Sequence, residues 1–269
     1  MEGTEGELNM EILSTSMYDS MLNTDFISEE IIETVDRIVA ATEVVVFFDL
    51  ETSGLTDNCE ILQIAAQYKD KTFSVYIKPR REIPPGASAV NGLTNVNGEL
   101  YLGGVKVSSV PLIKALRKFL SFLIDINHPV VLTAHNCNFD AKVLLNSIKK
   151  KSMIKDFGSI VTGFADSLRL IQTLTGRTGK GMCTLSGLAS WLNISTDSAH
   201  NAVYDVAMLA KIIESLSIST NLIIDTKINW SDCIPVLKKR GKKDLFGTLR
   251  KSDKSEISKY GEFLDVTNF

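Results

Sequence analysis

The amino-acid sequence predicts an α/β domain built on a mixed β-sheet. The first observation is an opening group of three strand-like segments, at residues 44–48, 61–68 and 72–78. Their short connections favour an antiparallel meander. The second observation is that strand and helix patterns alternate along the rest of the domain. The third is size, because 269 residues, of which 44% are apolar, suit one globular domain of about 150–200 residues with appendages.

Apolar periodicity predicts the later elements in order. Residues 80–93 contain several Pro and Gly residues and predict a loop. His128-Pro129 ends the first long helix. The expected helices cover residues 112–123, 138–150, 167–174, 184–192 and 202–216, and the expected later strands cover residues 130–134 and 160–165.

Composition divides the chain into three segments. Residues 1–43 carry eleven acidic side chains and one base, Arg37, and an apolar stripe after Ser28 predicts a short amphipathic helix there. Because the whole chain has a net charge of -3, the remainder is net basic. We expect an acidic N-terminal extension at 1–43, a single globular domain at 44–219 and a basic C-terminal extension at 220–269. The basic cluster at 238–243 fits phosphate contacts, a nuclear address or a solvated tail.

Several protein classes are excluded by the sequence. No apolar run is long enough to span a bilayer, and the acidic N-terminus lacks the pattern of a secretory signal. The four cysteines contain no C-x-x-C pair, which predicts reduced thiols and neither a zinc site nor a disulfide framework. We therefore expect an intracellular protein, nuclear or cytoplasmic, that is not associated with a membrane.

Two carboxylates follow the first apolar run, V-V-V-F-F, at Asp49 and Glu51. Residues two apart in a strand point to the same face, so the two acids share one side of the sheet. Two neighbouring carboxylates repel each other and lose hydration when buried, and a divalent cation removes both costs. The alternative is a strand that ends in a solvated acidic turn.

Two more acids stand at the start of predicted helices. Asp140 lies in the first turn of the 138–150 helix, which Asn136 or Asn138 can cap. Asp205 shares an apolar helix face with Met208 and Leu209. His200 stands five residues before Asp205 and can reach the same site. Taken singly, each acid can be a structural residue, but all four lie where buried elements begin or end.

These stretches resemble the three motifs of the DEDDh, or DnaQ-like, 3′–5′ exonucleases. The motifs are F-D-L-E-T-S-G-L at 48–55, A-H-N-C-N-F-D at 134–140 and H-N-A-V-Y-D at 200–205. The segment I-K-P-R-R-E-I-P-P-G-A-S-A-V-N-G-L-T and the junction F-A-D-S-L-R-L also resemble family segments. The resemblance runs from about residue 44 to residue 216. One departure is Asn91, which stands where many relatives carry histidine.

The resemblance implies a ribonuclease H-like fold, with a mixed β-sheet flanked by α-helices and the acids at one edge. It implies two divalent metal ions, Mg²⁺ or Mn²⁺, with His200 as the general base. The implied metal ligands are Asp49, Glu51, Asp140 and Asp205, and the implied substrate-binding residues are Thr52, Gly54, Leu55, Asn136 and Phe139. Asn136 can instead cap its helix, and Phe139 can stack on a base or simply pack.

Three functions remain open from the sequence. The leading one is a metal-dependent 3′–5′ exonuclease that hydrolyses single-stranded DNA or RNA from the 3′ end. A second is a non-catalytic nucleic-acid-binding or protein-binding module on an exonuclease fold. A third is a proofreading or processing subunit that a protein partner directs through the acidic or basic extension.

Overall fold

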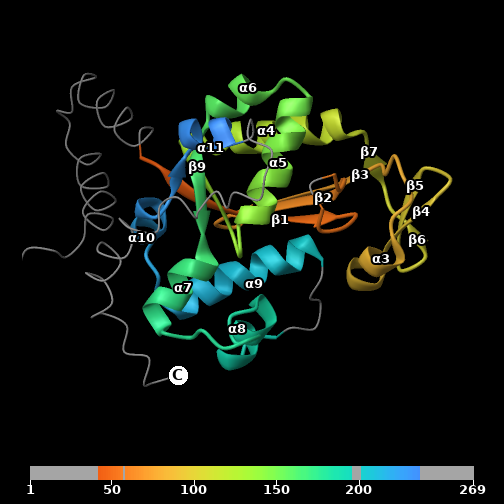
Figure 1. The fold of residues 1–269 in the computed structure, drawn as a ribbon. Coiled ribbons are helices and arrows are strands. Elements are labelled where there is room, and N and C mark those ends of the chain that lie inside the picture. The colour runs from red at the N-terminus through yellow and green to blue at the C-terminus, as the bar shows by residue number, and fades with distance from the viewer. Residues whose placement is uncertain (1–41, 57, 196–200, 237–269) are drawn as a thin grey trace, which may run out of the picture. The chain divides into compact units, whose positions relative to one another are not determined.

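A seven-stranded mixed sheet forms the centre of the computed structural model, which describes residues 42–56, 58–195 and 201–236 (Figure 1). The strands run in the order β10-β9-β8-β1-β2-β3-β7. They are β1 (Val44–Thr52), β2 (Ile61–Tyr68), β3 (Lys71–Ile77), β7 (Ser109–Val110), β8 (Val130–Ala134), β9 (Val161–Asp166) and β10 (Ile228–Asn229). The antiparallel β1-β2-β3 pairing confirms the predicted meander, and parallel pairing of β1 with β8 and of β8 with β9 makes the sheet mixed.

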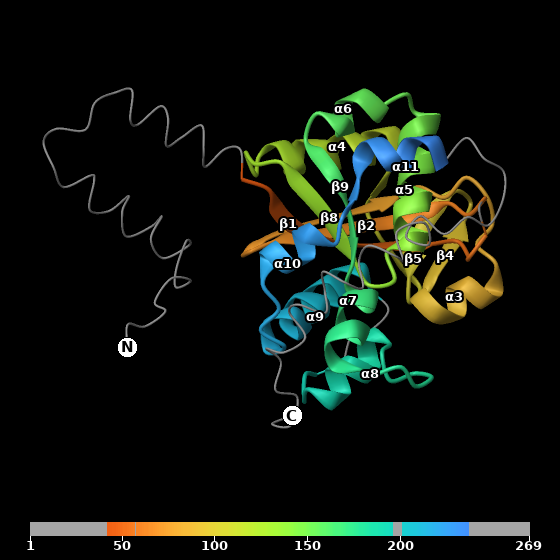
Figure 2. The same ribbon diagram turned by 60° about the vertical axis from the view of Figure 1, so that its left-hand side comes forward.

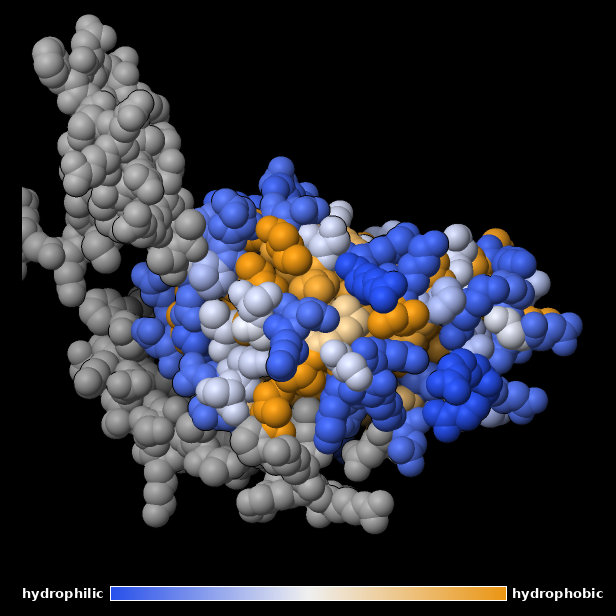
Figure 3. All heavy atoms as spheres, turned by 90° about the horizontal axis from the view of Figure 1, so that it is seen from above, coloured by the Kyte–Doolittle hydropathy of each residue, from blue (hydrophilic) through white to orange (hydrophobic). Residues whose placement is uncertain are grey.

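Helices cover both faces of this sheet, as the two ribbon views show (Figures 1 and 2). One face carries α4 (Leu112–Ile124), α5 (Asn138–Lys150), α6 (Ile154–Gly158) and α11 (Trp230–Val236). The other carries α7 (Ser167–Thr175), α8 (Leu185–Trp191), α9 (Ala202–Ser215) and α10 (Thr220–Asp225). The helices on each face pack against the sheet and form a separate hydrophobic core there. Seen from above, the outer surface of the molecule is largely hydrophilic around a band of hydrophobic residues (Figure 3).

Side-chain alternation along β1 decides which core each residue joins. Val46, Phe48 and Leu50 pack in the core beneath α4 and α5. Val45 and Phe47 pack in the core of α7 to α10. Asp49 and Glu51 continue this second series, so they lie on the face that α9 covers. The strand extends to Thr52, beyond the apolar run, and both acids therefore lie within it.

The prediction of a loop at residues 80–93 is wrong for residues 85–91, which form α3 (Pro85–Asn91). Pro85 is suited to a first helical turn, because its φ is preset and the missing N–H would have no partner there. Gly92 ends the helix with a left-handed φ of 68°. A three-stranded sheet follows, formed by β4 (Leu93–Val96), β5 (Glu99–Leu102) and β6 (Val105–Lys106). A small apolar cluster of Leu62, Ile83, Leu93 and Leu100 joins this unit to β2.

The segment after α9 also joins the main sheet. β10 pairs antiparallel with β9, and a Cβ on Gly163 would lie 2.2 Å from the carbonyl oxygen of Ile228. Trp230 stacks on Phe164 with 6.0 Å between ring centroids, and Lys227 forms an ion pair with Glu43. Residues 220–236, which were expected to begin the C-terminal extension, are thus packed on β9. The three-segment division of the chain stays a prediction.

Several expectations concern residues that the structure does not describe. The amphipathic helix after Ser28 and the basic cluster at 238–243 both lie outside the described residues. All four cysteines are free, as predicted. In the part of the chain that the structure describes, no helix combines the length and the apolar character needed to cross a bilayer.

Candidate active site

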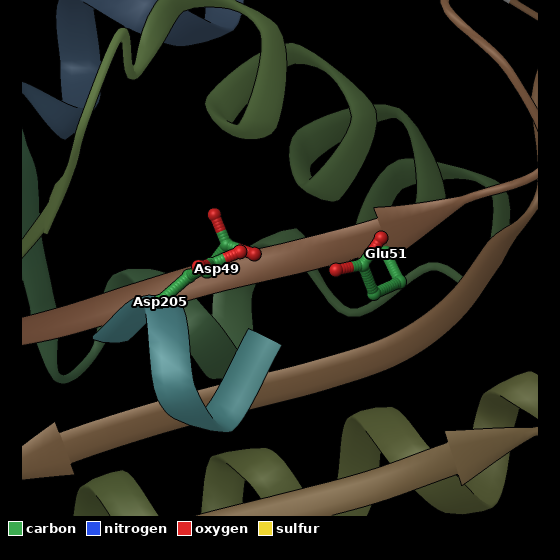
Figure 4. Close-up of side chains that lie close together, drawn as sticks. All are labelled: Asp49, Glu51 and Asp205. Carbon is green, nitrogen blue, oxygen red and sulfur yellow. The ribbon is translucent and has the colours of Figure 1, made fainter. Parts of the chain in front are cut away.

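Three carboxylates meet on the α9 face of the sheet. Asp49 and Glu51 project from β1, and Asp205 comes from the first turn of α9 (Figure 4). One carboxylate oxygen from each lies within 4.8 Å of the others. Residues that are more than 150 positions apart are thus brought together, as the sequence predicts. This spacing allows one cation to be shared by all three side chains.

The start of α9 is attached to the sheet by polar side chains. Asn201 is the N-cap of the helix, and its Oδ1 accepts a hydrogen bond from the backbone N–H of Val203. Gln63 Nε2 on β2 donates to the same oxygen at 3.4 Å. Asn201 Nδ2 donates to the hydroxyl of Tyr76 on β3 at 3.3 Å. These contacts place the first turn of α9, and with it Asp205, over β1.

Asp140 reaches the same site from the opposite side of the sheet. It lies in the first turn of α5 and is buried. The pairing of β1 with β8 ends at Phe47 and Thr133. The backbone N–H of Leu50 lies beyond the last pair and is not paired with β8. Asp140 accepts a hydrogen bond from this N–H, and its charge raises the pKa of Asp49. The fourth predicted acid therefore lies beside the other three.

Burial and mutual repulsion raise the pKa of these carboxyl groups. Burial and then the charge of Asp205 raise the pKa of Glu51 to about 7, against a hydrogen bond from Asn91 that lowers it. Burial is also the largest cause for Asp140, whose pKa rises to about 7. Burial, followed by the charges of its three neighbours, raises the pKa of Asp49 well above its usual range. Each shift disfavours the charged form.

The donor set fits divalent cations. In the part of the chain that the structure describes, no positively charged side chain is among the main causes of the pKa shifts of Asp49, Glu51 and Asp140. Four carboxylates gathered at one sheet edge are costly to ionise without a positive charge. Carboxylate oxygens are the ligands that hard cations such as Mg²⁺ and Mn²⁺ prefer. The fold thus supplies a site whose charge an added cation would balance.

We expect Asp49→Asn to stabilise the protein in the presence of a chelator at pH 8. A carboxyl whose folded-state pKa is raised contributes its full stability below the unfolded pKa near 4 and loses it as pH rises through the folded pKa. For Glu51 this window runs from about 4.5 to about 7. Relief of the repulsion by about one pKa unit is worth about 1.4 kcal/mol. Because 1 kcal/mol corresponds to about 2–4 °C at this size, the melting temperature should rise by roughly 3–5 °C.

Differential scanning calorimetry between pH 5 and pH 8 measures this effect. The wild-type protein in chelator should lose stability over that range, and Mn²⁺ should restore it. Glu214→Gln, at the exposed far end of α9, is the control for loss of an acidic side chain. A wild-type melting temperature that is unchanged between pH 5 and pH 8 in chelator would contradict the expectation.

The turn after Glu51 holds three of the five predicted substrate-binding residues. A register shift between Glu51 and Thr52 bends the end of β1. Thr52 is buried, and its hydroxyl donates to the carbonyl of Gly54 at 2.8 Å. Gly54 has a φ of 149°, and a Cβ there would meet nothing within 4 Å, so its backbone is open to a ligand. Leu55 is 86% exposed beside it.

Asn136 lies in the turn between β8 and α5, and Phe139 lies in the first turn of α5. The N-cap of α5 is Cys137, whose side chain makes no capping hydrogen bond, so neither Asn136 nor Asn138 occupies the predicted N-cap position. Asn136 is exposed with a left-handed φ of 61°. Phe139 is partly buried against the core beneath α5, which agrees with the packing alternative. Contact of either residue with a substrate stays a prediction.

His200 lies outside the described residues, which resume at Asn201. Its role as a general base therefore rests on the motif H-N-A-V-Y-D, five residues before Asp205.

Two residues that sequence reasoning did not assign to the site make polar contacts at the turn that precedes α5. Asp166 is buried, caps α7 by accepting from the N–H of Leu168, and also accepts from the backbone N–H of Cys137. His135 lies between Ser167 Oγ, at 3.0 Å, and the carbonyl of Cys183, at 2.7 Å. Because a carbonyl only accepts, Nε2 carries the proton in this contact. His135 lies in the motif A-H-N-C-N-F-D and Asp166 lies in the junction F-A-D-S-L-R-L. Nothing else in the sequence indicated that either residue lies near the site.

Comparison with known proteins agrees with this geometry. The model of the Exuperantia RNase H-like domain matches residues 43–192. The chain is 30% identical over 174 residues to a DNA polymerase III PolC-type of Caldanaerobacter subterraneus subsp. tengcongensis, covering 62% of this chain and 11% of that protein. It is 28% identical over 213 residues to the DNA polymerase III subunit epsilon of Buchnera aphidicola subsp. Acyrthosiphon pisum, covering 72% of this chain and 81% of that subunit.

Solved structures of exonuclease I have the same fold. For E. coli exonuclease I in complex with a dA16 oligonucleotide, the TM-score is 0.51 with 19% sequence identity. The match covers 65% of this chain and 41% of that one. The match covers 11% of the PolC-type polymerase, 41% of exonuclease I and 81% of the epsilon subunit. The chain therefore spans less than half the length of the first two proteins. The predicted ribonuclease H-like fold, a mixed sheet flanked by helices, is confirmed.

The family assignment follows from a match that covers more than half of the chain and from motifs that converge on one cluster. The chain belongs to the Exuperantia RNase H-like domain family.

Proposed function

We propose that this protein is a metal-dependent 3′–5′ exonuclease that removes nucleotides from single-stranded DNA or RNA. The observation that carries the proposal is the cluster of Asp49, Glu51 and Asp205, whose oxygens lie within 4.8 Å of one another, with Asp140 beside them. The epsilon-subunit relatives and the exonuclease I fold support the same class of activity.

The four acids would hold two divalent cations, Mg²⁺ or Mn²⁺. Such ions supply Lewis-acid chemistry, which stabilises the attacking and leaving oxygens of phosphodiester hydrolysis. Asp49 and Glu51 offer oxygens from the sheet, while Asp140 and Asp205 offer theirs from two helices on opposite faces. Binding would displace the protons that the raised pKa values retain near neutral pH.

His200 would act as the general base. An imidazole has an unperturbed pKa near 6.5 and can take the proton of the attacking water at neutral pH. The residues at 52–55 would receive the last nucleotide of the strand, with the open backbone at Gly54 beside the exposed side chain of Leu55. Asn136, exposed at the start of α5, would contact the same nucleotide.

A non-catalytic binding module is the second candidate. It would keep the nucleic-acid groove without chemistry, and the presence of all four acids and His200 speaks against it. A polymerase-like partner is a further proposal, because the epsilon relatives are subunits of a DNA polymerase. The extensions at 1–43 and 220–269 are the segments predicted to contact it, and an intracellular location, nuclear or cytoplasmic, stays a prediction.

A gel time course with the purified full chain tests the proposal. Single-stranded DNA and RNA oligonucleotides labelled at the 5′ end are incubated with Mg²⁺, Mn²⁺ or chelator, beside the Asp49→Ala protein. We expect a ladder that shortens from the 3′ end, requires the metal and is absent in the variant. Oligonucleotides that bind but stay intact under every condition would favour the binding module.

A further inference from the structure

Asn91 connects the α3–β4 unit to the candidate active site. It is the last residue of α3, and its side chain is buried with 6% exposure. Its amide Nδ2 donates a hydrogen bond to the backbone carbonyl of Thr52 at 3.2 Å. Its Oδ1 accepts a hydrogen bond from the backbone N–H of Leu93 at 3.1 Å. The side chain therefore links the start of β4 to the end of β1.

The same amide also bonds to a carboxylate of the site. Glu51 accepts a hydrogen bond from Asn91, and this contact opposes the effects of burial and of Asp205 on the Glu51 carboxyl. A primary amide has two N–H donors and one carbonyl acceptor. The Thr52 carbonyl and Glu51 take the donors, and the Leu93 N–H takes the acceptor. The polar capacity of the side chain is thus used on three different groups.

An imidazole cannot make this set of contacts, because it has two ring nitrogens for three partners. The contacts of the Asn91 amide turn the side chain inward onto β1.

The backbone that presents Asn91 is itself held in place. Gly92 is left-handed, and its N–H donates to the carbonyl of Ser88 at 2.8 Å. Leu93 is 1% exposed and packs with Leu62 and Leu100. The end of β1, by contrast, contains the register shift between Glu51 and Thr52. A rigid element thus contacts the strand at the point where its regular pairing is interrupted.

We propose that Asn91 is a positioning residue, which fixes Glu51 toward Asp49 and Asp205 so that the three carboxylates bind a cation together. The proposal rests on the proposed metal-dependent function. Loss of such an orienting contact costs about 10–100-fold in metal affinity or activity in other metal sites. We expect a loss of about tenfold here, because Glu51 is one ligand of several.

Calorimetric titration of the full chain with Mn²⁺ tests the proposal directly, since it measures binding without catalysis. The variants are Asn91→Leu, which removes all three hydrogen bonds, and Asn91→His, which can retain some of them. Asn95→Leu is the matched control. Asn95 stands on β4, donates to the carbonyl of Arg81 and accepts from the N–H of Gly98, and neither partner belongs to the candidate site.

We expect Asn91→Leu to weaken Mn²⁺ binding about tenfold and to lower kcat with little change in KM. Asn91→His should recover part of both losses, and Asn95→Leu should match the wild type. Unchanged Mn²⁺ affinity in folded Asn91→Leu protein would overturn the proposal, as would an equal loss in Asn95→Leu. If Asn91→Leu does not fold, the comparison of Asn91→Ala, which also removes the amide, with Asn95→Ala decides by the same criteria.

Failure of the proposed function gives a different result. A wild-type protein that binds Mn²⁺ but hydrolyses nothing would contradict the exonuclease, while the Asn91 titration would still report on the position of Glu51. Weaker binding in Asn91→Leu would then support the positioning role at a non-catalytic metal site.

Discussion

Asp205→Ala is expected to abolish hydrolysis of single-stranded oligonucleotides. Asp205 is the residue through which α9 contributes to the cluster on β1, and its oxygen lies within 4.8 Å of those of Asp49 and Glu51. Metal ions supply several kcal/mol of transition-state stabilisation, and about 4 kcal/mol corresponds to a loss on the order of 10³-fold. We therefore expect no product within the time course in which the wild type consumes its substrate.

The variant is also expected to fold. Its melting temperature in chelator should equal or exceed that of the wild type, because a charge that raises the pKa values of Asp49 and Glu51 has been removed. Glu214→Gln, on the exposed surface of the same helix, is the matched control and should retain full activity. Full activity in Asp205→Ala would remove the two-metal interpretation of the site.

His200→Ala is expected to lower turnover while Mn²⁺ and oligonucleotide binding stay close to wild type. General-base catalysis contributes about 10²–10⁴-fold, so kcat should fall by that factor. The wild-type kcat should decrease as pH falls through about 6.5, because the protonated imidazole cannot accept a proton. At a Mn²⁺ concentration that saturates the site at every pH, this decrease should be absent from the residual activity of the variant.

His128→Ala is the matched control for removal of a histidine. His128 precedes β8, whereas the candidate site lies beyond the other end of that strand. Titration calorimetry with Mn²⁺ and fluorescence anisotropy with a labelled oligonucleotide measure the two binding steps. A large loss of Mn²⁺ affinity in His200→Ala would instead make the residue a ligand or a structural residue.

Much of the fold was predictable because its signals are local. The helix at 138–150 and the strands at 61–68 and 130–134 match α5, β2 and β8 residue for residue. Their apolar periodicity is set by the geometry of the element itself. The α3 helix was missed because the pair Pro85-Gly86, which is a loop signal, stands at its start and Gly92 follows its last residue. The β10 strand was missed because two residues carry no periodicity.

The candidate site, like the fold, was predictable only where local patterns decide the direction of a side chain. A period of two residues places Asp49 and Glu51 on one face of a strand, and helical spacing turns Asp205 toward the core. Those patterns do not say which face of the sheet α9 covers. That choice came from tertiary packing, in which Val45 and Phe47 share a core with α9 and so bring the acids of β1 to Asp205.

By itself, then, the sequence determined the elements that carry the four acids and the order of the motifs, because a residue's direction within a strand or helix is a local property. The tertiary structure alone decided the contacts of Asn91 with Thr52 and Glu51, of Asp166 with Cys137, and of Gln63 with Asn201. These polar contacts join segments that are distant in the chain, and their partners depend on how the elements pack, which no periodic pattern records.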